Sequence, residues 1–244
     1  MKNITVNTNN LLRLQSAYAD IVGIVGDDPR MAICHGFAGA GKTTGIRKLA
    51  IEHGDIFLRA SCTWTPSALL GDIATELRLE CGRSRASRLR GIKEAMDANP
   101  RTIFLDDADQ LFNVGSKQAV LVLFETLREI HDEAQVPIFF VGMENFAARV
   151  RQWEQVARRV VENLEFQPLS IDDAALVARQ RCEVAVEPAL IELLHEHSGG
   201  SCGRITNGLR AIERYGKQLE LDPVTLKAWR SSGRKFYLDL VRTK

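Results

Sequence analysis

A glycine-rich segment between residues 36 and 43 has the residue types and spacing of a loop that binds phosphate. It reads GFAGAGKT and fits the pattern G-x-x-x-x-G-K-[ST], with an apolar stretch before it and a helical pattern after it. Glycines let successive backbone N–H groups point at phosphate oxygens, and the start of the helix adds positive potential. Lys42 would place a cation at the β- and γ-phosphates of a nucleotide, and Thr43 would offer a hydroxyl to Mg²⁺. The predicted nucleotide-binding residues are Gly36, Ala38, Gly39, Ala40, Gly41, Lys42 and Thr43. The alternative is a glycine-rich turn with a chance lysine, which the flanking strand and helix disfavour.

An acidic segment about sixty residues later could complete this site. The segment TIFLDDAD places Asp106 directly after four residues of a buried type of strand. Asp106 is expected to hold Mg²⁺ through water, and Asp107 lies where a general base would polarise an attacking water. Glutamate is usual at that second position, and aspartate is one methylene shorter, which predicts slow turnover. Taken alone, the two carboxylates could equally cap a helix or lie in a solvated loop.

Two arginines could neutralise the charge that spreads over phosphoryl oxygens in a transition state. Arg159 lies in QVARRVVENLEFQPL, just before the last predicted strand, and Arg204 lies in GGSCGRITNGL, at the start of a later helix. Arg159 would protrude at the domain edge toward a neighbouring subunit, and Arg204 could fold over bound nucleotide. Periodicity does not decide between Arg158 and Arg159, and either arginine could simply be a solvated surface residue.

The elements that must position these residues alternate between strands and helices. Such alternation predicts a parallel sheet that is covered on both faces. The predicted strands are 31–35, 55–59, 102–106, 137–142 and 159–166. The predicted helices are 11–25, from 42 onward, 65–79, from the end of an Arg-rich stretch at 82–90 to about 98, and 116–134.

After Pro168 only helical periodicity remains, as far as Tyr215. Ser170 with Asp173 resembles a capping box, with aspartate in place of the usual glutamate. The predicted domains are an N-terminal helix and leader at 1–29, an α/β core at 30–168, a helical lid at 169–216 and a basic tail at 217–244.

Composition excludes several classes of protein. The chain has 244 residues, and 32 lysines and arginines against 31 acidic residues give a net charge of +1, so no global bias marks a polyanion partner. No apolar run reaches the roughly 18 residues of a membrane helix, and the N-terminus lacks a signal-peptide core. Five scattered cysteines without a C-x-x-C pair favour free thiols in a reducing cytoplasm.

The order of GFAGAGKT, TIFLDDAD, PIFFVGMEN, ARRVVENLEFQPL and GGSCGRITNGL resembles that of the AAA+ ATPase superfamily. Within it, the chain resembles the transposition ATPases of the Mu B protein, TniB and TnsC kind, over roughly residues 10 to 216. The resemblance implies a P-loop α/β core with a five-stranded parallel sheet flanked by helices, followed by a small all-helical lid.

The same resemblance implies an activity. Such proteins hydrolyse ATP with Mg²⁺, bind double-stranded DNA without regard to sequence as a ring or helical filament of identical subunits, and deliver that target to a transposase. The implied location is the cytoplasm of a bacterium or of a phage-infected host, with no membrane partner.

The resemblance also implies roles for individual residues, according to their positions in the shared motifs. Thr44 joins the nucleotide-binding set, Arg159 matches the arginine-finger position and Arg204 matches the second sensor. The first sensor is normally a small polar residue right after the glycine that ends the fourth strand. Here that residue is Met143, and Asn145 is the expected substitute.

DNA contacts are expected from a basic stretch and one helix start. Residues 82–93, GRSRASRLRGIK, contain five cations and no acid. We therefore expect contacts to the phosphate backbone of DNA and a binding affinity that depends strongly on salt. The alternative is a solvated polar loop. The predicted DNA-binding residues are Arg83, Arg85, Arg88, Arg90 and Lys117, and the basic tail is equally suited to DNA, a transposase or packing on the lid.

Two rival functions share the phosphate loop. A secretion-associated ATPase of the ExeA type would add a membrane segment or a peptidoglycan-binding domain after the lid. A replication initiator or loader would add a winged helix or helix-turn-helix domain. The sequence after Tyr215 has neither pattern.

Overall fold

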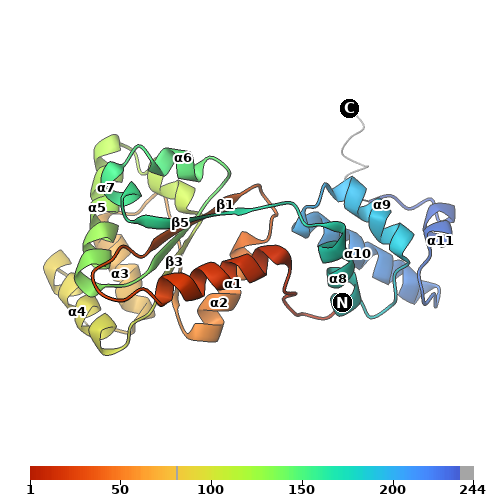
Figure 1. Cartoon of the computed structure of the whole chain (residues 1–244), viewed down its shortest axis with the longest axis horizontal. Coiled ribbons are helices and arrows are strands. Elements are labelled where there is room, and N and C mark those ends of the chain that lie inside the picture. The colour runs from red at the N-terminus through yellow and green to blue at the C-terminus, as the bar shows by residue number, and fades with distance from the viewer. Residues whose placement is uncertain (81, 237–244) are drawn as a thin grey trace. The chain divides into compact units, whose positions relative to one another are not determined.

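The computed structural model of the chain describes residues 1–80 and 82–236, which form two compact units (Figure 1). The core unit comprises Arg13–Phe37 and Lys42–Phe166. The helical unit comprises Met1–Leu12, Ala38–Gly41 and the chain from Gln167 onward. Residues 237–244 of the predicted basic tail lie outside the described residues.

The core unit contains a five-stranded parallel sheet in the order β2-β3-β4-β1-β5. All five strands predicted from the sequence are present, each within two residues of the expected limits, and the expected fold class is confirmed. The strands are β1 (Met31–Gly36), β2 (Ile56–Arg59), β3 (Ile103–Asp106), β4 (Ile138–Val141) and β5 (Val160–Phe166).

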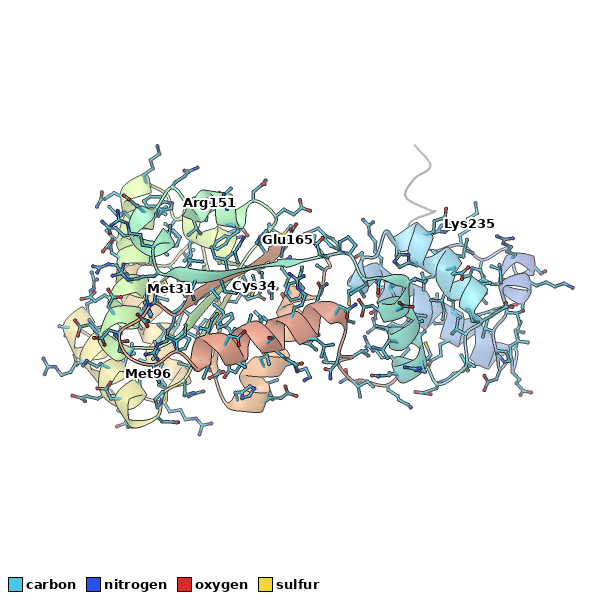
Figure 2. The ribbon with its side chains drawn as sticks, viewed as in Figure 1. Met31, Cys34, Met96, Arg151, Glu165 and Lys235 are labelled. Atoms are coloured by element: carbon cyan, nitrogen blue, oxygen red, sulfur yellow. The ribbon has the colours of Figure 1, made fainter. Side chains whose placement is uncertain are left out.

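Successive residues of β1 belong to opposite faces of the sheet, because side chains alternate along a strand. Met31 and Ile33 belong to the larger apolar cluster, whereas Cys34 lies on the other face (Figure 2). On that second face, the ring of Tyr18 lies 6.0 Å from that of Phe104 and 6.1 Å from that of Phe139.

Helices cover both faces. The second face packs against α1 (Asn9–Val22) and α2 (Lys42–His53), and the larger cluster packs against the remaining helices of the core unit. These remaining helices are α3 (Pro66–Glu76), α4 (Arg85–Ala98), the 3-10 helix η1 (Ala108–Asn113), α5 (Lys117–Ala134), α6 (Phe146–Val150) and α7 (Glu154–Ala157).

Capping residues set where two of these helices begin. Thr65 accepts a hydrogen bond from Ala68 N–H ahead of Pro66, as the sequence predicts. The Arg-rich stretch is helical earlier than predicted, because the Ser84 hydroxyl accepts from Ser87 N–H and starts α4 at residue 85.

The helical unit has its own apolar core, to which Leu190, Leu209 and Trp229 contribute. Ser170 caps α8 by accepting from Asp173 N–H, but the Asp173 carboxylate accepts from the backbone of Asn9 and leaves the capping box one-sided. The helices of the helical unit are α8 (Ile171–Arg181), α9 (Pro188–Ser198), α10 (Cys202–Gln218) and α11 (Leu226–Ser231).

The N-terminal segment belongs to this helical unit. Val6 lies in its core, and the Asn10 side chain both donates to the Gln167 carbonyl at 2.7 Å and accepts from its N–H at 3.1 Å. The ammonium of Met1 pairs with Glu213. Across the described part of the chain, we find no helix with the length and apolarity needed to traverse a bilayer.

Candidate nucleotide-binding site

The predicted site residues follow the carboxyl ends of neighbouring parallel strands, which meet at one edge of the sheet. The phosphate loop follows β1, the acidic segment follows β3, and the loop after β4 lies between them because β4 pairs with both strands. In open parallel sheets, this edge is where ligands bind.

The loop after β1 needs glycine for two separate reasons. A Cβ on Gly36 would lie 2.7 Å from the carbonyl oxygen of Phe166 on β5, so a side chain would separate the paired strands. Gly41 has φ +97°, a conformation that other residues rarely adopt, and the chain enters α2 directly after it.

Lys42 begins α2, and its ammonium lies against the loop. Its Nζ donates hydrogen bonds to the carbonyls of Gly36 at 2.6 Å and Phe37 at 2.9 Å. Burial lowers the pKa of Lys42, and nearby carboxylates, Asp106 foremost, oppose that shift. The cation therefore lies at the position where the predicted loop needs positive charge.

Thr43 and Asp106 meet, as a shared magnesium site requires. The Thr43 hydroxyl donates to Asp106 Oδ1 at 3.1 Å, and Asp106 is only 2% exposed at the end of β3. Burial raises the pKa of the Asp106 carboxyl, the bond from Thr43 lowers it, and the charge of Asp107 raises it further. A hydroxyl and a carboxylate are hard oxygen donors of the kind that Mg²⁺ prefers, so these residues fit that ion.

Asp107 carries an ion pair that the sequence analysis missed. Its Oδ2 accepts from Arg59 Nε and Nη2, both at 2.6 Å, and its backbone is left-handed with φ +51°. Arg59 ends β2 and pairs in register with Asp106 on β3. The available signal was that Arg59 ends one predicted strand and Asp107 directly follows another, but using it required knowing that those strands are neighbours.

The loop after β4 places Met143 and Asn145 at the same edge of the sheet. The side chain of Met143 is 45% exposed, and its backbone N–H donates to Asp109 Oδ2 at 2.6 Å. Asn145 precedes α6 and makes no side-chain capping bond. Its assignment as the first sensor stays a prediction.

Arg158 and Arg159 have different surroundings. The guanidinium of Arg159 is bound within the core unit by Asp132 of α5, with Nε to Oδ1 at 2.7 Å and Nη2 to Oδ2 at 2.6 Å. Among the described residues, Arg158 is paired only with Glu154, and the two side chains are 74% and 76% exposed. The choice of finger stays a prediction, although this geometry leaves Arg158 the more able to reach outward.

In the helical unit, Arg204 lies in the first turn of α10 and is exposed. It lines a cavity of about 270 Å³ together with Leu194 and Asn207. The Gly39 carbonyl accepts from Gly203 N–H at 3.1 Å, so the middle of the phosphate loop and the first turn of α10 are joined within this unit. The role of Arg204 as second sensor stays a prediction.

Some residues predicted to bind DNA are occupied by contacts within the core unit. Arg85 pairs with Glu129 of α5 at 2.8 Å, and Arg88 donates to the Ser67 carbonyl at 2.6 Å. Three others are exposed and make no ion pair with any described residue, namely Arg83, Arg90 and Lys117.

A phosphate loop after the first strand of a parallel sheet, with a Thr–Asp pair whose oxygens fit magnesium, is the arrangement of a P-loop nucleotide-binding protein. A family model described as an AAA domain matches residues 26–150, just over half of the chain. The chain belongs to the AAA domain family.

A curated relative confirms the resemblance to transposition regulators. The Mu-like prophage FluMu DNA transposition protein B of Haemophilus influenzae is 26% identical over 162 residues. The alignment covers 61% of this chain and 53% of that protein, so the chain spans about half the length of this relative.

Solved structures of two ORC proteins share the fold. The Aeropyrum pernix ORC2 protein matches with a TM-score of 0.69 at 15% identity, covering 95% of this chain and 69% of that one. The Aeropyrum pernix ORC1 protein in complex with DNA matches with a TM-score of 0.61 at 18% identity, covering 95% and 66%. At these identities the likeness shows the fold alone.

Proposed function

We propose that this protein is an ATP-hydrolysing regulator of DNA transposition, which assembles on duplex DNA in its ATP-bound form and presents that DNA to a transposase. The match to a DNA transposition protein B is the observation that carries the proposal. Membership of the AAA domain family and the Lys42, Thr43 and Asp106 arrangement support the nucleotide-dependent part.

The chain's own residues divide the work of hydrolysis. Lys42 would balance the charge of the β- and γ-phosphates, and Thr43 with Asp106 would hold Mg²⁺, whose charge would stabilise the negative charge that develops on the departing ADP. Asp107 would orient the attacking water once its carboxylate separates from Arg59, to which it is bound at 2.6 Å. Because Arg59 and the attacking water would compete for the Asp107 carboxylate, turnover should be slow, as the shorter aspartate side chain also predicts.

We assign the finger to Arg158, because its exposed pair with Glu154 can open at little cost, whereas Arg159 is bound twice by Asp132. A guanidinium from a neighbouring subunit would neutralise charge on the phosphoryl oxygens of ATP. Arg204 would contact the phosphates from the subunit that binds them.

The surface proposed for DNA is the start of α4 with the start of α5. Arg83, Arg90 and Lys117 are exposed and can approach phosphates without first breaking an ion pair to a described residue. Arg85 and Arg88 would contribute less, because each already donates within the core unit.

Electron microscopy with long duplex DNA tests the proposed assembly. ATP should give ordered protein-coated DNA and ADP should not, and Lys42→Ala should abolish assembly with either nucleotide. Purified protein that leaves DNA bare in ATP, at low salt and micromolar concentration, would refute the proposal.

A salt titration tests the proposed DNA surface. The double variant Arg83→Ala, Arg90→Ala should weaken binding and reduce the slope of log affinity against log salt by about two, because each lost phosphate contact removes about one unit. Arg210→Ala, which removes an exposed cation of α10, is the control. An unchanged slope in the double variant would exclude this surface.

A further inference from the structure

Asp109 is the third carboxylate of the acidic segment, and the roles proposed above for Asp106 and Asp107 leave it without one. It lies in η1, and its side chain is only 20% exposed. Its Oδ2 accepts the backbone N–H of Met143 at 2.6 Å, and its Oδ1 lies 3.6 Å from Nη1 of Arg149. One carboxylate therefore contacts both the loop after β4 and the helix α6 that follows it.

Arg149 makes a second connection between η1 and α6. Its guanidinium carbon lies 4.0 Å from the ring centre of Phe112, which belongs to η1. That ring in turn lies 5.6 Å from the ring of Phe146 at the start of α6. The cation–π contact and the ring contact both hold α6 against η1.

The loop between these contacts has little freedom. Gly142 N–H donates to the Cys34 carbonyl of β1 at 2.9 Å, and a Cβ on Gly142 would lie 2.4 Å from the ring of Phe146. The loop is thus fixed to β1 on one side through Gly142 and to η1 on the other through Met143. Since β4 lies between β3 and β1, the fixed loop lies between Asp106 and the phosphate loop.

Carboxylates of this loop and of η1 also lie close enough to Lys42 to act on its charge. Asp109 and Glu144 both act on the ammonium of Lys42 and raise its pKa against the effect of burial. The carboxylate that holds the loop is therefore also close enough to the phosphate loop to influence its cation.

We propose that Asp109 is a positioning residue, which fixes residues 143–145 beside the terminal phosphate of bound ATP by accepting the Met143 N–H and pairing with Arg149. This role rests on the proposed ATP hydrolysis. Loss of the carboxylate would let the loop move away from the reacting phosphate, while the phosphate loop that binds ATP would remain intact.

Steady-state kinetics of two variants test the role. Asp109→Ala removes both contacts and should lower kcat about tenfold while KM for ATP stays within about twofold, because small displacements near reacting atoms cost rate. Asp109→Asn keeps an oxygen that accepts the Met143 N–H and should restore kcat to within about threefold of wild type. Arg149→Gln removes the ion pair but leaves the hydrogen bond from Met143 N–H in place, and it should also keep kcat within about threefold of wild type.

Amide hydrogen exchange without nucleotide provides a readout that does not depend on hydrolysis. A peptide covering residues 138–146 should exchange about tenfold faster at Met143 in Asp109→Ala, and close to the wild-type rate in Asp109→Asn. If Asp109→Ala fails to fold, the other two variants still test the role. Asp109→Asn removes the carboxylate charge and Arg149→Gln removes the ion pair, and both keep the hydrogen bond from Met143 N–H.

The outcomes separate this role from the proposed function. Wild-type kcat or wild-type exchange in folded Asp109→Ala would overturn the positioning role and leave ATP hydrolysis standing. Equal losses in Asp109→Ala and Asp109→Asn would also overturn it, because the retained acceptor would then be irrelevant. A wild-type protein that binds ATP but does not hydrolyse it on any DNA would overturn the proposed function itself.

Discussion

Replacing Arg159 with alanine should destabilise the core unit rather than abolish a contact between subunits. The guanidinium donates two short bonds to Asp132, with side chains that are 25% and 33% exposed. Hydrogen bonds to charged groups contribute about 1.5–3 kcal/mol each when well buried, and partial exposure reduces the pair together to about 2 kcal/mol. For a protein of this size, that loss corresponds to a fall in Tm of about 4–8 °C.

Thermal unfolding and ATPase assays together distinguish the two arginines. Arg159→Ala should show the lower Tm, and Asp132→Asn should reproduce most of it. Arg158→Ala should keep the wild-type Tm, because its pair with Glu154 is exposed, but should lose turnover in DNA-bound assemblies. A wild-type Tm for Arg159→Ala, together with turnover that is lost only in assemblies, would refute this reasoning and make Arg159 the finger.

Three further predictions concern charge. Arg59→Ala should raise kcat about two- to fivefold at saturating ATP, because it frees the Asp107 carboxylate from an exposed ion pair; a fall in kcat would show that Arg59 acts on the nucleotide instead. Asp107→Asn, which suits the left-handed backbone there, should lower kcat at least about a hundredfold while ATP affinity stays within about twofold; unchanged turnover would place the base elsewhere. Burial acts to raise the pKa of Asp132, but the hydrogen bonds and charge of Arg159, together with the charges of His131 and Arg128, outweigh it and hold that pKa below 3.8. The stabilisation is therefore complete above pH 3.8 and is lost as pH falls from there through the folded-state pKa. Urea unfolding midpoints between pH 2 and 5 should fall further in wild type than in Asp132→Asn, because other paired carboxylates such as Glu213 titrate in both proteins.

Local sequence was sufficient for the sheet and the nucleotide loop. Four of the strands consist largely of a short apolar run, whereas β5 (Val160–Phe166) carries Glu and Asn among its apolar residues. The phosphate loop needs only residues that are contiguous in the chain. Thr43 and Asp106 could be paired in advance because each belongs to a motif with a chemical role, and the structure places them 3.1 Å apart.

Contacts that depend on strand order could not be predicted in the same way. Arg59 meets Asp107, and Asp109 meets Met143, only because β3 lies between β2 and β4. The start of α4 differs from the prediction for a separate reason, since a run of arginines is equally suited to a solvated loop. Only the Ser84 cap and the contact of Arg85 with Glu129 distinguish a helix there.

The packing of α1 bears on how the smallest working fragment should be chosen. The Tyr18 hydroxyl donates to Asp55 Oδ2 at 2.7 Å, and the other oxygen of Asp55 accepts the Thr102 N–H at 2.8 Å, ahead of β3. The family match begins at residue 26, beyond this helix. A recombinant fragment that started there would present the rings of Phe104 and Phe139 to water and would be prone to aggregate, so expression boundaries belong ahead of Asn9.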